Sequence, residues 1–310
     1  MINEERITIT NDIKIGTTIS YQDKTSKRTL VLIIMGTGTT DRDGNTKGFH
    51  SNLYKDLSDV FVKMGCVCIR YDKRGTHEST GNYKTASLTN FVNDAANVIH
   101  YAKKLNYVDE NKIIVCGHSE GAMIATLLTR IENLYGIILL GGACTGMKEA
   151  MLYQNYLILE QAQNMKGILG WYLRKVLKKE KITKQVNDLF NKAMKSNKKR
   201  YFYNGAFFDT EYMREHYSLT SKSYIELLKK YKGRILAITG KSDVQADYRS
   251  LENIRNLNNT TIYTPENINH ILREINGDNN ILTVKKQYKR LLKNNIYSGI
   301  KKEINDWLIK

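Results

Sequence analysis

The chain has 310 residues, a formal charge of +17 at pH 7, and no apolar run that approaches the roughly 18 residues of a membrane span. A chain of this length can bury roughly 75% of its unfolded surface, which is enough for one large domain with an insertion. Residues 1–10 lack the basic start and apolar stretch of a secretory signal. We therefore expect a soluble, cytoplasmic protein.

The positive charge does not by itself indicate a nucleic-acid partner. Lysine, asparagine, isoleucine and tyrosine are all abundant and Pro265 is the only proline, which indicates a general compositional bias. The cysteines lie in or beside apolar segments, without the paired C-x-x-C spacing of metal or redox sites. They are Cys66, Cys68, Cys116 and Cys144. We expect buried thiols, with no metal, no cofactor and no nucleic-acid partner.

The first half of the chain alternates between strand-like and helix-like segments. Residues 7–10 and 13–21 are predicted to form an N-terminal hairpin. Further strands are predicted at residues 30–35, 66–71, 112–116 and 136–141, and helices at residues 53–61, 91–102 and 122–130. This alternation predicts a mostly parallel sheet covered by helices, with ligands bound beyond the carboxyl ends of the strands.

The pentapeptide Gly117-His118-Ser119-Glu120-Gly121 joins one predicted strand to the next helix. It is a G-x-S-x-G motif in strand-turn-helix context. A serine on so tight a turn adopts strained backbone angles, and the flanking positions are glycine because a β-carbon there would collide with the neighbouring strand or helix. We expect the turn to present the Ser119 hydroxyl to a cleft as a nucleophile.

Between Gly142 and about Leu227 the alternation stops, and the sequence predicts helices without strands. Two apolar stripes at helical spacing predict amphipathic helices that cover the mouth of the site as a cap. The stripes are Leu169, Leu173, Val176 and Leu177, then Val186, Leu189, Phe190 and Ala193. An aromatic patch either packs the cap against the core or lines an apolar pocket; it comprises residues 201–203, Phe207, Phe208 and Tyr212.

Residues 171–200 hold eleven Lys or Arg against two acidic residues, Glu180 and Asp188, for a net charge of +9. Such a run is typical of a solvated helix face. It is also what a surface that attracts anionic partners would carry, so a weak contact with an anionic membrane surface is the second interpretation.

Strands return after the cap, at residues 234–240 and 260–264. A serine hydroxyl needs a base to remove its proton, and the base needs a carboxylate to orient it. Asp243 follows the first of these strands and His270 follows the second, so the chain supplies both groups after Ser119. Asp247 is the alternative acid, and Asp243 is favoured because it lies nearer the strand end.

With this order of serine, aspartate and histidine, the sequence resembles the α/β-hydrolase superfamily, in its capped esterase, lipase and peptidase branch. Residues 36–44 are similar to the family's oxyanion loop, usually written HGxG, and residues 71–79 to its D-x-R-G-x-G-x-S turn. The resemblance covers nearly the whole chain outside the central insertion. Met35 stands where the family usually has histidine, and His77 where it often has glycine.

The resemblance implies an eight-stranded type of mostly parallel sheet with helices on both faces. It implies a hydrolase core in two parts, residues 1–144 and 228–310, and a helical cap at residues 145–227. The backbone N–H groups of Thr37 and Glu120 are expected to form the oxyanion hole. We expect Asp41-Arg42-Asp43-Gly44 to hold a loop-bracing ion pair, because it lacks the ligand spacing and distal glutamate of a calcium loop.

The favoured function is hydrolysis of a carboxylic ester, small or acyl-lipid-like, through an acyl-enzyme on Ser119. An aminopeptidase or acyl-peptide hydrolase on the same fold would need an acidic or carbonyl cluster in the cap to hold the substrate amino group, and the basic cap argues against it. A noncatalytic binding protein is the third interpretation, and the order of the triad argues against that. Acyl length, ester or amide preference and oligomeric state stay open.

Overall fold

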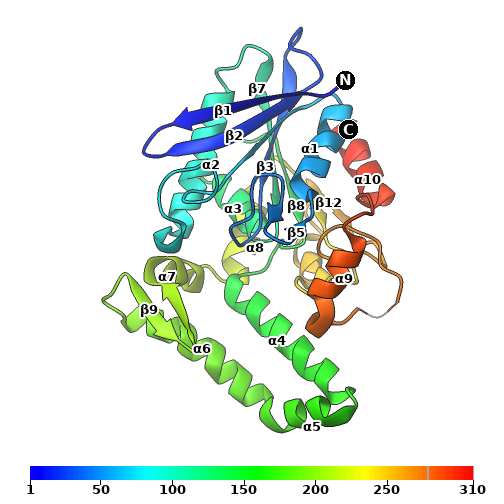
Figure 1. Cartoon of the computed structure of the whole chain (residues 1–310). Coiled ribbons are helices and arrows are strands. Elements are labelled where there is room, and N and C mark those ends of the chain that lie inside the picture. Colours follow the sequence, from blue (N-terminus) through cyan, green and yellow to red (C-terminus); the bar gives the residue numbers. More distant parts are fainter. Residues whose placement is uncertain (278, 310) are drawn as a thin grey trace.

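A computed structural model describes residues 1–277 and 279–309. This part of the chain forms a central eight-stranded sheet in the order β1-β2-β6-β3-β7-β8-β11-β12 (Figure 1). The strands are β1 Asn3–Thr10, β2 Lys14–Tyr21, β3 Arg28–Ile34, β6 Val67–Tyr71, β7 Val108–His118, β8 Gly136–Leu140, β11 Arg234–Ile238 and β12 Thr260–Tyr263. The pairs β1–β2 and β2–β6 are antiparallel and the remaining pairs are parallel. The predicted mostly parallel sheet is confirmed.

Helices cover both faces of this sheet, so its central strands are buried on both sides. Leu30 and Leu32 of β3 face one apolar cluster, while Val31 and Ile33 face the other. The helices around the sheet are α1 Leu53–Lys63, α2 Leu88–Ala102, α3 Glu120–Leu128, α8 Ser221–Lys230, α9 Val284–Leu291 and α10 Ser298–Ile309. Continuous apolar strands such as residues 30–34 follow from this double burial. All four cysteines are buried free thiols.

The segment between β8 and β11 projects from one end of the core, with α4, α5 and α6 extending away from the sheet (Figure 1). It comprises α4 Met147–Gln163, α5 Gly167–Val176, α6 Lys179–Lys195, β9 Arg200–Tyr203, β10 Ala206–Asp209 and α7 Thr210–Ser218, followed by α8. Tyr224 and Leu228 of α8 pack into the core. The cap boundary at residue 227 stays a prediction. Within residues 1–277 and 279–309, no helix has the length and apolar character to cross a bilayer.

The prediction of a cap without strands is wrong, because β9 and β10 form an antiparallel hairpin. Asn204 and Gly205 connect them, with φ angles of 44° and 85°. A two-residue turn whose twist matches that of the paired strands requires positive φ at both of its central residues. Asn-Gly is the sequence that adopts these angles most easily. The Asn-Gly pair is therefore the signal that identifies this hairpin in the sequence.

The second predicted apolar stripe of the cap is buried, and its side chains pack with Tyr201 and Met213. The first stripe is only partly correct, because Leu169 is exposed and Gly170 is the buried residue of α5. A β-carbon at Gly170 would lie 2.1 Å from the carbonyl oxygen of Met165, so only glycine allows this close approach. Contact with the backbone, rather than burial of leucine, sets the orientation of α5.

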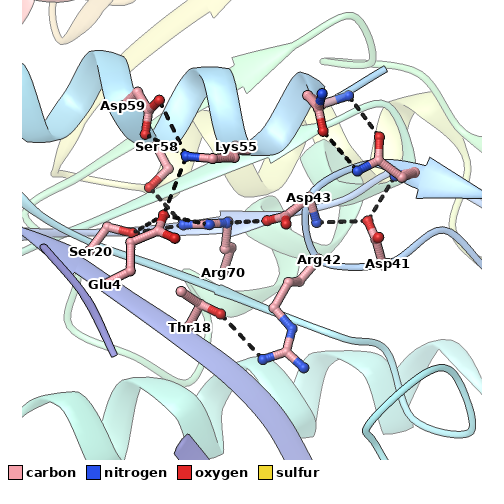
Figure 2. Close-up of polar contacts among 12 residues, drawn as sticks. Glu4, Thr18, Ser20, Asp41, Arg42, Asp43, Lys55, Ser58, Asp59 and Arg70 are labelled. Atoms are coloured by element: carbon pink, nitrogen blue, oxygen red, sulfur yellow. Dashed lines mark hydrogen bonds and ion pairs between the residues drawn. The ribbon is translucent and has the colours of Figure 1, made fainter. Parts of the chain in front are cut away.

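Buried ion pairs fix the loop that follows β3. Arg70 of β6 donates to Asp43 Oδ1 at 2.6 Å, to Ser20 Oγ at 2.7 Å and to Glu4 Oε1 at 2.8 Å (Figure 2). Arg42 Nη2 lies 2.6 Å from Asp72 Oδ2. Both Arg70 and Arg42 are buried, so each carboxylate offsets the cost of removing a guanidinium from water. The expected bracing of residues 41–44 by ion pairs is confirmed.

Candidate active site

Ser119 lies between the end of β7 and the start of α3, with φ 56° and ψ −122°. This conformation is strained for any residue with a β-carbon. It persists because close contacts surround it: a β-carbon at Gly117 would lie 2.1 Å from the Gly121 carbonyl oxygen, and one at Gly121 would lie 2.1 Å from that of Ile34. The two glycines of the motif therefore let the strand, turn and helix meet.

His270 and Asp243 form a buried pair, with His270 Nδ1 2.7 Å from Asp243 Oδ2. The second oxygen of Asp243 accepts hydrogen bonds from the backbone N–H groups of Gln245, at 2.7 Å, and Ala246, at 2.9 Å. Asp247 instead pairs with Arg249, at 2.8 Å. The structure thus brings Asp243, and not Asp247, to His270.

Ser119 and His270 line one cavity of about 510 Å³. Its wall combines the carboxyl ends of the strands with the first half of α4. Apolar side chains form much of the wall: Phe49, Met123, Met147, Ala150, Met151 and Ile271. The cavity therefore offers apolar surface beside a serine and a histidine, whereas the aromatic residues 201–203, Phe207, Phe208 and Tyr212 do not line it.

Thr37 and Glu120, the two predicted oxyanion donors, also line this cavity. The neighbouring amides are engaged, since Gly36 N–H donates to the Tyr54 hydroxyl at 2.8 Å and Gly38 N–H to the Tyr83 hydroxyl at 3.0 Å. In the described part of the chain, the N–H groups of Thr37 and Glu120 have no acceptor. The fold therefore leaves both N–H groups unoccupied, and their role as an oxyanion hole stays a prediction.

His118 connects these loops, a role that the sequence did not reveal. Its Nδ1 lies 3.1 Å from the Tyr54 hydroxyl, and its Nε2 lies 2.8 Å from the His270 carbonyl oxygen. Because the Tyr54 oxygen already accepts from Gly36, its hydrogen is available for Nδ1, and the His118 proton then resides on Nε2. Burial, with the nearby His270, lowers the pKa of His118 to about 3, so this ring stays neutral.

The Glu120 side chain forms a buried ion pair. Lys73 Nζ lies 2.7 Å from Glu120 Oε2 and donates to the Gly36 carbonyl oxygen, also at 2.7 Å. The Tyr212 hydroxyl of α7 donates to the other Glu120 oxygen, and His216 Nε2 lies 3.6 Å from it. Burial alone would raise the pKa of Glu120, but the charge of Lys73 and the contact with His216 hold it below the usual range.

Two further positions have positive φ, Gly141 at the cavity and His77 in the loop after β6. A β-carbon at Gly141, where φ is 57°, would lie 3.1 Å from both Asp243 Oδ2 and His270 Nδ1. His77 has a φ of 45°, and its Nε2 lies 3.0 Å from the Thr39 carbonyl oxygen. Glycine adopts this left-handed backbone more easily than histidine does.

Comparison with known proteins identifies the family and the fold. The sequence profile of the serine aminopeptidase S33 family matches residues 47–254. No curated protein sequence matches the chain. Est1E from Butyrivibrio proteoclasticus, solved with ferulic acid bound, has a TM-score of 0.58 at 18% identity, and the match covers 94% of this chain and 99% of that one.

Two further solved structures share the fold. The Pyrococcus furiosus esterase Pf2001 has a TM-score of 0.56 at 12% identity, over 99% of this chain and 92% of that one. The α/β hydrolase GrgF from Penicillium sp. sh18 has a TM-score of 0.55 at 11% identity, over 96% and 99%. The family profile spans more than half of the sequence. The chain therefore belongs to the serine aminopeptidase S33 family and is an α/β hydrolase.

Proposed function

We propose that this hydrolase cleaves carboxylic esters through an acyl-enzyme formed on Ser119. The observation that carries the proposal is the shared cavity: Ser119 and His270 line it together, and Asp243 holds His270 Nδ1 at 2.7 Å. A carboxylate on Nδ1 fixes the tautomer in which Nε2 is free to act as a base. The triad is thus Ser119, Asp243 and His270.

The reaction follows from these positions. His270 takes the Ser119 proton as the serine oxygen attacks the ester carbonyl, and the N–H groups of Thr37 and Glu120 stabilise the negative oxygen of the tetrahedral intermediate. Each such donor is worth about 3 to 4 kcal/mol in the transition state. His270 then protonates the leaving alcohol, and a water molecule, activated by the same histidine, releases the acid and regenerates Ser119.

The charges around the cavity favour an ester over a substrate with a free amino group. An aminopeptidase would hold that amino group with an unpaired carboxylate or a cluster of carbonyls. Among the described residues that line the cavity, Glu120 is paired with Lys73 and Asp247 with Arg249. Asp243 is paired with His270. The apolar wall instead offers room for an acyl group. The shared fold of the Pyrococcus furiosus esterase supports the same preference.

A substrate panel tests this proposal. The purified protein is given p-nitrophenyl esters of increasing acyl length and, in parallel, aminoacyl p-nitroanilides. We expect turnover of the esters, little turnover of the anilides, and loss of ester turnover in Ser119→Ala but not in Ser26→Ala, which alters an exposed serine outside the cavity. Faster cleavage of the anilides would contradict the ester assignment, and an active Ser119→Ala would contradict the mechanism.

A further inference from the structure

Helix α5 points an apolar face into solvent. Ile168, Trp171, Tyr172 and Lys175 follow i, i+3, i+4, i+7 spacing and so lie on one side of this helix. Ile168 is 87% exposed, Trp171 58% and Tyr172 53%, and Leu169 beside them is also exposed. Adjacent large apolar side chains that are exposed to solvent are typical of a surface that binds a protein, a membrane or a ligand.

The opposite side of α5 is tightly fixed, so this exposure is a property of the fold. Gly170 packs against the Met165 carbonyl oxygen, where a β-carbon would be only 2.1 Å away. Arg174 Nη1 donates to the same carbonyl at 2.7 Å and to that of Ala162, at the end of α4, at 3.2 Å. These contacts leave α5 one orientation, with Ile168 and Trp171 outward.

The position of α5 suits a docking surface. It lies at the end of the cap that is farthest from the sheet, where the chain turns from α4 to α6 (Figure 1). The first half of α4 lines the cavity, and α5 follows directly after the end of α4. A membrane or partner that binds α5 would therefore contact the tip of the cap.

Positive charge surrounds the apolar face. Residues 166–181 carry six exposed basic side chains and one acidic side chain, Glu180. The basic residues are Lys166, Arg174, Lys175, Lys178, Lys179 and Lys181. Lys175 Nζ lies 5.2 Å from the centroid of the Trp171 ring, so cation and aromatic ring share one surface. Basic residues around an apolar face with tryptophan and tyrosine are typical of helices that lie in the interface of an anionic membrane.

We propose that the tip of the cap, α5 with its flanking lysines, docks on an anionic lipid bilayer. Ile168 and Trp171 enter the boundary between headgroups and acyl chains, and Lys175, Lys178 and Lys179 contact the anionic headgroups. A second copy of the chain is the poorer occupant, because like faces would bring two sets of six cations together. The proposal does not depend on the reaction proposed for Ser119.

A second exposed aromatic pair in the cap provides a matched control. Phe207 is 62% exposed and contacts Phe202 across the β9–β10 hairpin, and Arg200 stacks on its ring at 5.4 Å. This hairpin follows the 17 residues of α6, so it lies roughly 25 Å along that helix from α5. Phe207→Ser therefore removes an aromatic residue that also has basic neighbours, but at the other end of the cap.

Tryptophan fluorescence tests the proposal directly, since Trp171 is exposed and Trp307 is buried. The full chain is mixed with phosphatidylcholine vesicles that contain phosphatidylglycerol, with and without brominated lipid. We expect a blue shift and quenching by the bromine atoms, both absent with pure phosphatidylcholine and lost in about 1 M salt. Trp171→Phe should lose both signals, which assigns them to this residue.

Vesicle sedimentation separates the contribution of the apolar face to membrane binding from that of the lysines. The partition coefficient should fall roughly tenfold or more in Ile168→Ser, and by a similar factor in a triple variant with Gln in place of Lys175, Lys178 and Lys179. The control variant Phe207→Ser should leave the partition coefficient unchanged. The proposal is overturned if anionic vesicles leave the Trp171 spectrum unchanged, or if Phe207→Ser loses binding while Ile168→Ser retains it. A blue shift that rises with protein concentration in the absence of lipid would also overturn it, by assigning the face to a second copy.

Discussion

The imidazole of His118 donates from Nε2 to the main-chain carbonyl oxygen of His270, at 2.8 Å. This contact ties the serine turn to the loop that carries the proposed base. On the other side of the ring, the Tyr54 hydroxyl links His118 to the Gly36 amide. One neutral, buried histidine thus positions the loops on both sides of Ser119.

The first prediction concerns acid stability. The pKa of His118 is about 3 in the folded chain, against an ordinary value near 6.5, so the unfolded chain binds more protons between these values. Folding stability should therefore fall as the pH drops through this window, by up to about 1.4 kcal/mol per pH unit from this residue. Urea unfolding at a series of pH values from 7 to 4 measures the slope.

His118→Gln provides the control, because its amide can donate to His270 and accept from Tyr54 without titrating. Its unfolding free energy should depend less steeply on pH than that of the wild type. Equal slopes for the two proteins would show that His118 is not the group that takes up the proton on unfolding.

The second prediction separates the two candidate acids. Asp243→Asn should keep the fold but lower kcat roughly 10⁴-fold, because an amide favours the wrong tautomer of His270. Asp247→Asn should change kcat little, since Asp247 pairs with Arg249. Steady-state kinetics on a short p-nitrophenyl ester provide both values, and the reverse pattern would move the acid to Asp247.

The third prediction concerns the buried pair of Lys73 and Glu120. Lys73→Met leaves Glu120 charged and without its cation, which should cost about 3 to 5 kcal/mol of stability. The double variant Lys73→Met/Glu120→Gln should recover part of this loss. Chemical denaturation of the two single variants and the double variant measures the coupling, and strictly additive losses would mean that the pair does not interact.

The same variants should affect catalysis in the proposed reaction. Lys73 also donates to the Gly36 carbonyl oxygen, so its loss frees the peptide group that carries the Thr37 N–H. In the double variant Lys73→Met/Glu120→Gln, kcat should stay below the wild-type value even though part of the stability is recovered. KM should change by a smaller factor than kcat. A double variant with the wild-type kcat would remove Lys73 from the positioning of the oxyanion loop.

The fourth prediction compares two glycines with positive φ. Gly141→Ala and Gly205→Ala carry similar backbone strain, since their φ angles are 57° and 85°. Only the new methyl group at position 141 meets the Asp243–His270 pair, whereas nothing lies within 4 Å at position 205. Displacing that pair should lower kcat on the order of 10²-fold. Equal activities of the two variants would show that the space beside Gly141 is not required.

Much of the fold could be predicted because its signals are local. Apolar runs such as residues 30–35 identify buried strands, and the G-x-S-x-G pattern predicts the turn at Ser119. The sequence favours Asp243 over Asp247 from its distance to a strand end, and the structure pairs Asp243 with His270. Asn204-Gly205 is also a local signal, and the hairpin that it forms is the reason why the expectation of an all-helical cap is wrong.

Other features depend on contacts that no local pattern contains. Lys73 meets Glu120 because β6 and β7 both pair with β3, one on each side, which brings their carboxyl ends together. The strand order, not the spacing of the two residues, creates this pair. The orientation of α5 is likewise set by the contact of Gly170 with a carbonyl oxygen of the preceding turn, so counting leucines along the helix could not predict it.

The most direct test of the proposed mechanism is covalent labelling of Ser119 by a fluorophosphonate. This reagent requires a nucleophilic serine activated by its neighbours, and peptide mass spectrometry locates the adduct without knowledge of the natural substrate. We expect one modified peptide that contains Ser119, no labelling in Ser119→Ala, and labelling slowed by orders of magnitude in His270→Ala, which removes the base. An adduct on another serine, or equal labelling of wild type and Ser119→Ala, would contradict the proposed mechanism.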